Sequence, residues 1–190
     1  MAYQIEMKTR MFINEILKYT CARFHSNGQR WVYFDMEVEM RLFQEVIRPD
    51  YQMMRKAQKP DEPYDTPLYV IEVKRTDYRA RNIKEHLNQH FKQLRHICIQ
   101  NGLSQIYGVH TNYREWFFTR YDLQQEVQAE LKLAERSSKG ATFNESNPYA
   151  MTEEIIYEVS DSFELLDSRD NSLRIPVLKQ ITQILEWLIT

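Results

Sequence analysis

The sequence predicts an α/β fold in which a central mixed β-sheet is flanked by helices. Residues 69–73 form a β-branched and apolar run that ends in charge, which is typical of a buried strand. Residues 79–101 and 174–188 repeat apolar side chains at helical spacing, which indicates two amphipathic helices. With 190 residues, 43% of them hydrophobic, the chain is long enough to bury a core, and we expect one domain over residues 1–190.

The first part of the chain predicts a helix followed by a β-hairpin. Apolar side chains recur at helical spacing over residues 3–22, and a Ser-Asn-Gly turn follows at 26–28. Apolar and charged side chains alternate over residues 31–42, which is the period of a strand with one buried face. We expect residues 46–54 to form the second strand, paired with the first through a short hairpin.

The rest of the chain predicts loops, strands and a further helix. A proline-containing, charged segment at 55–67 and a Ser-, Asn-, Gly- and Pro-rich segment at 136–152 indicate loops. Strands are expected at 105–110, at 115–120 and near 154–164, and a helix is expected at 122–135.

The composition limits the classes of function and the cellular locations that we expect for the chain. The formal net charge is −2, so the chain lacks the strongly basic balance typical of a dedicated nucleic-acid binder. A polyanion site must therefore be a local patch or be supplied by a partner. Cys21 and Cys98 lie in apolar helical surroundings, which predicts buried free thiols. Because no run of eighteen apolar residues and no signal-peptide pattern occurs, we expect an intracellular protein, cytoplasmic or nuclear, without a membrane association.

Two short strings carry the candidate chemistry. Pro49-Asp50 lies in the predicted second hairpin strand, and Glu72-Val73-Lys74 ends the buried strand. Because side chains alternate faces along a strand, Glu72 and Lys74 point to the same face. Charged groups on an apolar strand are costly to bury unless they have partners or a use. If Asp50 ends the neighbouring strand, its carboxylate can share a divalent cation with Glu72.

These strings resemble the PD-(D/E)XK nuclease superfamily, which has the restriction-endonuclease-like fold. They are most similar to the nuclease domains of type I restriction subunits and related stand-alone proteins. Those proteins often carry an Arg-Pro-Asp-Tyr string, an Ile-Glu-Val-Lys strand, a helix with a glutamine, a strand that ends in Thr-Asn or Thr-Asp, and an aromatic Trp-x-Phe strand. The chain has these features in the same order, at residues 48–51, 71–74, 79–101, 107–112 and 115–118. The resemblance covers residues 30–121 and implies one nuclease-like domain.

The resemblance implies a metal-dependent nuclease that hydrolyses phosphodiester bonds, with DNA a more frequent substrate than RNA. Mg²⁺ or Mn²⁺ would be held by Asp50, Glu72 and the carbonyl of Val73, and Lys74 would orient the attacking water. Nuclease folds of this type often place a first-helix glutamate beside the metal, and Glu15 is favoured over Glu6. The helix glutamine that steadies the site in several branches is Gln89 or Gln93, and the sequence does not choose between them.

Further polar groups flank these positions. The histidines at i and i+4, His86 and His90, have no third zinc ligand nearby, so we expect them on the helix surface. Basic residues follow the strand and start the helix, where they oppose the helix dipole and suit phosphate contacts; they are Lys74, Arg75, Arg79, Arg81 and Lys84.

Two other hypotheses compete with the active nuclease. The chain can be a catalytically inactive nuclease-fold module that binds nucleic acid or assembles with a protein partner or a second copy. Alternatively the motif arises by chance, which predicts that Asp50 and Glu72 lie far apart in the fold.

Overall fold

The predicted α/β class, with a central mixed sheet flanked by helices, is confirmed by the computed structural model. The structure describes residues 2–28, 31–37, 39–42, 45–58, 64–74, 83–125, 127, 157–167 and 169–190. Its elements in chain order are α1 (Ala2–Ser26), β1 (Val32–Met36), β2 (Met40–Leu42), β3 (Glu45–Ile47), β4 (Tyr51–Arg55), β5 (Thr66–Val73), α2 (Ile83–Asn101), β6 (Gln105–Thr111), β7 (Glu115–Asp122), β8 (Tyr157–Val159), β9 (Phe163–Glu164) and α4 (Ile175–Trp187).

The main sheet places β5 near its centre. Within the described residues this sheet has seven strands in the order β1-β4-β5-β6-β7-β8, and β9 also pairs with β7. Strands β5 and β6 are parallel, whereas the other pairs are antiparallel. A parallel pair needs a long crossover connection, and α2 lies in this connection. The strand that carries Glu72 is therefore buried between two neighbours and covered by its own crossover helix.

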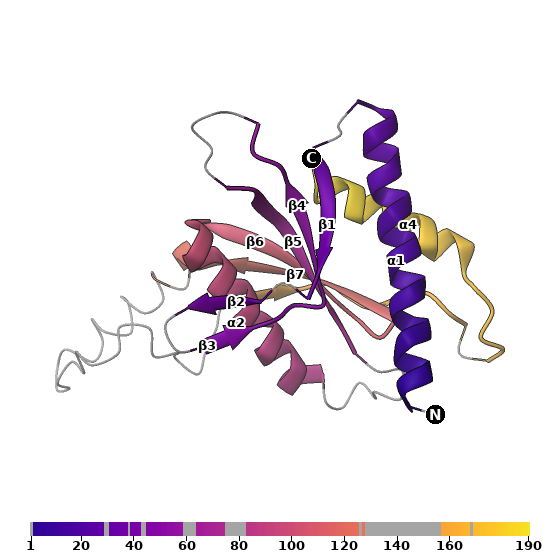
Figure 1. The fold of residues 1–190 in the computed structure, drawn as a ribbon. Helices are drawn as coiled ribbons and strands as arrows, with labels where there is room; N and C mark the ends of the chain where they lie inside the picture. The colour runs from indigo at the N-terminus through magenta and orange to yellow at the C-terminus, as the bar shows by residue number, and fades with distance from the viewer. Residues whose placement is uncertain are drawn as a thin grey trace.

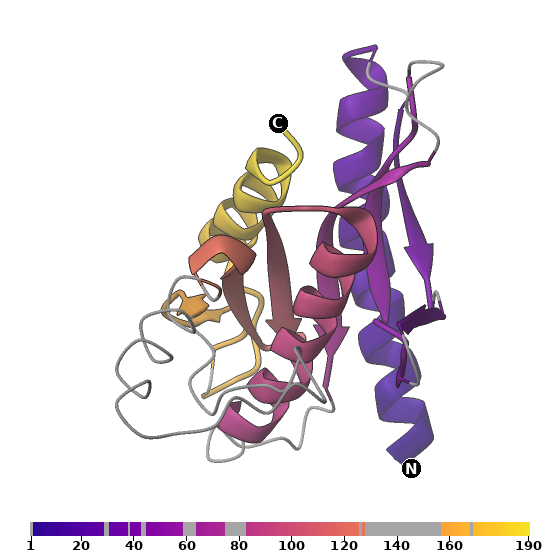
Figure 2. The same cartoon turned by 90° about the vertical axis from the view of Figure 1, so that its left-hand side faces the viewer.

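The helices lie on both faces of the sheet (Figures 1 and 2). Helices α1 and α4 pack on one face, and α2 packs on the other. Successive side chains of β5 point to opposite faces of the sheet, so Ile71 packs in the core under α1 and α4, while Val70 packs in the core under α2. Burial on both faces explains why residues 69–73 are almost continuously apolar.

The long helices follow their apolar stripes. In α1 the buried residues Ile13, Leu17, Cys21 and Phe24 recur at intervals of four, four and three, so the stripe continues past the predicted end at residue 22. The expected core stripe of α2 is confirmed by the buried side chains of Leu87, Phe91, Leu94 and Cys98. Both cysteines are buried thiols, as predicted. Among the described helices, none has the length and apolar character needed to cross a bilayer.

The prediction of one continuous strand over residues 31–42 is wrong. Glu37 has a φ of 51°, a left-handed conformation that ends β1 and turns the chain. Strands β2 and β3 then form a separate two-stranded sheet, the β2–β3 hairpin, beside α2 (Figure 1). As a result β1 pairs with β4, and Asp50 lies immediately before β4 rather than inside a strand.

The end of the chain differs in detail from the prediction. The strands near 105–110 and 115–120 and the last helix are confirmed as β6, β7 and α4. The strand expected near 154–164 is instead two short strands, β8 and β9, which pair with different parts of β7. The expected helix at 122–135 and the loop at 136–152 fall mostly or wholly outside the described residues, as do parts of the loop at 55–67 and residues 79–82.

Candidate active site

The pairing of β4 with β5 brings Asp50 close to Glu72. Strand β4 pairs antiparallel with β5, with Gln52 opposite Val70 and Tyr51 opposite Ile71. Asp50 lies one residue before β4, and its Oδ2 accepts a hydrogen bond from the backbone N–H of Val73, the residue next to Glu72. The negative charge of Glu72 also raises the pKa of Asp50, which shows that the two carboxylates are close. The two acids therefore lie together, which is the opposite of what a chance motif predicts.

Asp50 is held from two sides. Its Oδ2 accepts a hydrogen bond from the backbone N–H of Val73 at 2.7 Å, and its Oδ1 accepts one from Arg10 Nη2 at 2.8 Å. Burial and the negative charge of Glu72 raise the pKa of Asp50 to about 6, although the Val73 N–H, Arg10 and Lys74 oppose the shift. The raised pKa indicates that its local partners do not fully compensate the buried charge of this carboxylate.

Glu72 is more deeply buried, with 5% of its surface exposed, and both of its carboxylate oxygens have partners. Oε1 accepts a hydrogen bond from Lys74 Nζ at 2.5 Å, as expected for residues two apart on one face. Oε2 accepts one from Gln93 Nε2 of α2 at 3.0 Å. Pairing and hydrogen bonding satisfy a charge that would otherwise be costly to bury. Strand β5 and helix α2 thus meet at this carboxylate.

A turn after β6 supports the backbone of Lys74. The backbone N–H of Lys74 donates to the carbonyl of Thr111 at 2.7 Å. Thr111 Oγ1 donates to the carbonyl of Glu115, and Asn112 Oδ1 accepts from the backbone N–H of Glu115, each at 2.8 Å. The Thr-Asn string therefore has a structural role here, since its side chains close the β6–β7 turn that lies against Lys74.

Arg10 is a site residue that the sequence analysis missed. Its guanidinium bridges two carboxylates, Asp50 and Glu37, and it comes from α1. Contact across 40 residues leaves no local pattern in the sequence. The structure does not bring Glu15 to this position: its side chain is 71% exposed and pairs with Lys18 on the helix surface.

The structure distinguishes between the two candidate glutamines. Gln93 is 3% exposed and contacts Glu72, whereas Gln89, one turn earlier, is exposed. The placement of His90 on the helix surface was wrong, because His90 is fully buried. It reaches the sheet because Gly108 leaves room for its ring, and its Nε2 lies 3.0 Å from Thr119 Oγ1.

His90 belongs to a buried polar cluster that continues inward from Glu72. Its ring centroid lies 5.9 Å from that of His110. Burial, with smaller contributions from His110 and Lys74, lowers the pKa of His90 to about 3, so the imidazole is neutral at ordinary pH. The apolar stripe of α2 could not reveal this, because the space for the ring is made by residues on β6 and β7.

Most of the expected phosphate-binding cluster falls outside the described residues. Arg75, Arg79 and Arg81 fall outside the described residues, and Lys84 lies in α2 without a described side chain. Of the predicted basic set, Lys74 alone has a described side chain.

The two acids of the candidate site are ligands of the type that a hard divalent cation takes. Asp50 and Glu72 supply carboxylate oxygens, and Gln93 Oε1 is buried without a hydrogen-bond partner in the described part of the chain. Over that same part, no group of three or more His, Cys, Asp or Glu side chains could hold a metal. Mg²⁺ commonly takes one or two protein carboxylates and completes its coordination with water and substrate phosphate. The use of Asp50, Glu72 and the Val73 carbonyl as metal ligands stays a prediction.

Comparison with known proteins gives only distant likenesses. No protein-family model and no curated protein matches the chain. Among solved structures it is similar to the type IIG restriction endonuclease BpuSI, with 20% identity and a TM-score of 0.41 over 58% of this chain, and it spans only 11% of that enzyme's length. It is also similar to a protein from Anabaena variabilis described as "a putative nuclease belonging to DUF820", with 13% identity and a TM-score of 0.33 over 92% of this chain and 80% of that one. Likeness at this level assigns neither a family nor an activity.

Proposed function

We propose that the protein is a metal-dependent nuclease that hydrolyses phosphodiester bonds of nucleic acid, with DNA the preferred substrate. One observation carries the proposal: Asp50, just before β4, bonds to the backbone of Val73 and its pKa responds to the charge of Glu72, and Lys74 is bonded to Glu72. The element order supports it, because β4, β5, α2, β6 and β7 follow the order that the resemblance to PD-(D/E)XK nucleases implied.

The residues of the site suit this reaction. A bound Mg²⁺ or Mn²⁺ would act as a Lewis acid toward the phosphate and make water a better nucleophile at neutral pH. Asp50 and Glu72 would hold the ion, and their mutual repulsion would fall as it binds. Water attacks phosphorus, the bond from phosphorus to the leaving oxygen breaks, and that oxygen takes up a proton. Lys74 Nζ would orient the water and stabilise the negative charge that develops on the phosphate.

A second candidate function rests on the ion pairs of the same site. Asp50 pairs with Arg10 and Glu72 pairs with Lys74, so each acid already has a cationic partner without a metal. Such a site can serve a nuclease fold kept as an inactive binding or assembly module. Calorimetric titration with Mn²⁺ separates the two, because the enzyme binds the ion at these acids and the inactive module does not.

The decisive experiment is a cleavage assay with purified protein, Mn²⁺ and DNA or RNA side by side. Wild type should cleave, and the Asp50→Ala and Lys74→Ala variants should not. Lys179→Ala, which removes an exposed lysine on α4, is the matched control and should retain cleavage. Cleavage that persists in both site variants, or no cleavage by a wild type that binds no Mn²⁺, would overturn the proposal.

A further inference from the structure

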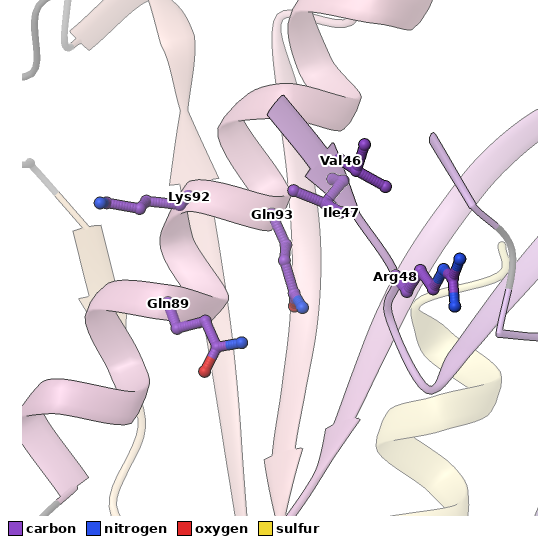
Figure 3. Close-up of a pocket in the computed structure, with 6 residues that line it drawn as sticks. All are labelled: Val46, Ile47, Arg48, Gln89, Lys92 and Gln93. Atoms are coloured by element: carbon purple, nitrogen blue, oxygen red, sulfur yellow. The ribbon is translucent and has the colours of Figure 1, made fainter. Parts of the chain in front are cut away.

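A groove lies between the β2–β3 hairpin and α2, next to the candidate active site (Figure 3). It has a volume of about 510 Å³, and its lining residues are Val46, Ile47, Arg48, Gln89, Lys92 and Gln93. One wall is the end of the hairpin and the other is one turn of the helix. In Figure 3, Gln93 lies between Lys92 on one side and Arg48 on the other.

The lining combines three kinds of groups that recognise a nucleotide. Arg48 and Lys92 are exposed cations that can contact phosphate. Gln89 adds an amide that can bond to a base edge or a sugar, and Val46 adds an exposed apolar side chain, whereas Ile47 packs against the α2 core. None of the six lining residues is acidic, although the chain as a whole carries more acidic than basic residues. The six lining residues thus carry two cations and no acid, on a chain of net charge −2.

The groove is physically connected to the acid pair. Gln93 lines the groove and donates to Glu72 Oε2 at 3.0 Å, so one side chain contacts both. A chain of phosphates that lies along the groove would pass beside Glu72. The volume falls within the range of about 300–1,000 Å³ for pockets that hold one small ligand, a range that includes a single nucleotide.

We propose that this groove binds the sugar-phosphate backbone of one strand of nucleic acid, with Arg48 and Lys92 as the phosphate contacts, and guides it to Asp50 and Glu72. The guiding role rests on the proposed function, whereas the binding role does not. Arg48 also pairs with Glu39 of the hairpin, so strand binding would exchange a carboxylate partner for a phosphate. The hairpin would then serve as one wall of the strand-binding site.

The test measures binding without cleavage, by fluorescence anisotropy of a short labelled single-stranded oligonucleotide in EDTA. The Arg48→Gln/Lys92→Gln variant should bind about tenfold more weakly, and its dependence of log K on log salt should be shallower by about 1.4, since each lost phosphate contact removes about 0.7 for a single strand. The matched control is Arg169→Gln/Lys179→Gln, which removes the same two charge types from exposed positions outside the groove and should bind like wild type.

A second variant separates phosphate contact from a merely structural role of Arg48. Glu39→Gln breaks the same ion pair but frees Arg48, so it should bind as well as wild type or more tightly. If Glu39→Gln weakens binding as much as the Arg48→Gln/Lys92→Gln variant does, the arginine only holds the hairpin and the inference is wrong. Unchanged affinity of the double variant also overturns it, as does a duplex bound more tightly than the single strand. EDTA removes the metal, so this binding test does not depend on cleavage. If wild type cleaves nucleic acid but the Arg48→Gln/Lys92→Gln variant binds the oligonucleotide with unchanged affinity, the groove proposal is rejected and the proposed function is not.

Discussion

Gln93 Nε2 donates a hydrogen bond to Glu72 Oε2 at 3.0 Å, and both side chains are almost fully buried. This bond joins helix α2 to strand β5 at the residue that would hold a metal. A glutamine suits this place, because it donates to a carboxylate without adding a second charge. The helix therefore sets the direction of the acid as well as covering it.

Replacing Gln93 with Met should destabilise the fold, since Met has a similar shape but no donor for the buried carboxylate. Loss of a hydrogen bond to a charged group costs about 1.5–3 kcal/mol of the free energy of unfolding. Urea denaturation measures this change. Gln89→Met is the matched control, one turn away and exposed, and should leave the midpoint unchanged. Equal effects of the two variants would mean that the bond to Glu72 contributes nothing.

Mn²⁺ should raise the thermal midpoint of the wild type. A ligand that binds only the folded state adds about 2.7 kcal/mol at 100 times its Kd. Asp50→Asn should lose this shift, because it removes one of the two acids. The comparison is Glu37→Gln, which removes the other acid paired with Arg10 and should keep the shift. A shift that survives in Asp50→Asn would place the ion elsewhere.

Gly108→Ala should destabilise the interface of β6 with α2. A Cβ atom at this position would lie 2.3 Å from His90 Nε2 and 2.4 Å from Thr119 Oγ1. Overpacking of this kind costs about 1–3 kcal/mol. In a His90→Ala background the penalty should be smaller, because the clashing ring is absent, and a double-mutant cycle by urea denaturation measures the difference. Additive effects would contradict the proposed clash.

Stability should fall in acid because of His90. The pKa of His90 is about 3 in the fold against an ordinary value of about 6.5, so its contribution is fully present above pH 6.5 and is lost as pH falls toward 3. One such group changes the free energy of unfolding by at most about 1.4 kcal/mol per pH unit.

A matched variant isolates the histidine. His90 faces His110 of β6, with Lys74 of β5 as the other nearby charge, and the raised pKa of Asp50 acts in the opposite direction between about 3.8 and 6. His90→Gln keeps a group that can bond to Thr119 but cannot titrate, so the stability difference between wild type and this variant cancels the contribution of Asp50. As pH falls, the wild type should lose more free energy of unfolding than His90→Gln does. A difference between the two that does not change with pH would show that His90 does not cause the effect.

The parts of the fold that local patterns control were predictable from sequence. Alternation and helical periodicity gave β5, α2, β6, β7 and α4, because each buries an apolar face that repeats along the chain. The break at Glu37 was not predictable, since the alternating pattern continues through residues 31–42 while the backbone turns. The alternation of apolar and charged residues shows which face of a strand is buried, but it does not show at which residue the strand leaves the sheet.

The candidate site divides in the same way. The prediction that Glu72 and Lys74 share one face is confirmed by the hydrogen bond between them, because the period of two along a strand fixes their direction. Asp50 was predicted beside them from the resemblance. Arg10 and the burial of His90 were missed, because each depends on a neighbour far away in sequence: Asp50 for the arginine, Gly108 for the histidine. Spacing along one element carries no information about such a partner.

The reach of Arg10 across 40 residues has a consequence for how the protein matures. No short segment of a growing polypeptide contains all the groups that orient the two acids, because they come from the first helix, two strands and the crossover helix. During synthesis the acid pair stays unassembled until these segments have docked. The arrangement thus emerges late, together with the finished tertiary structure.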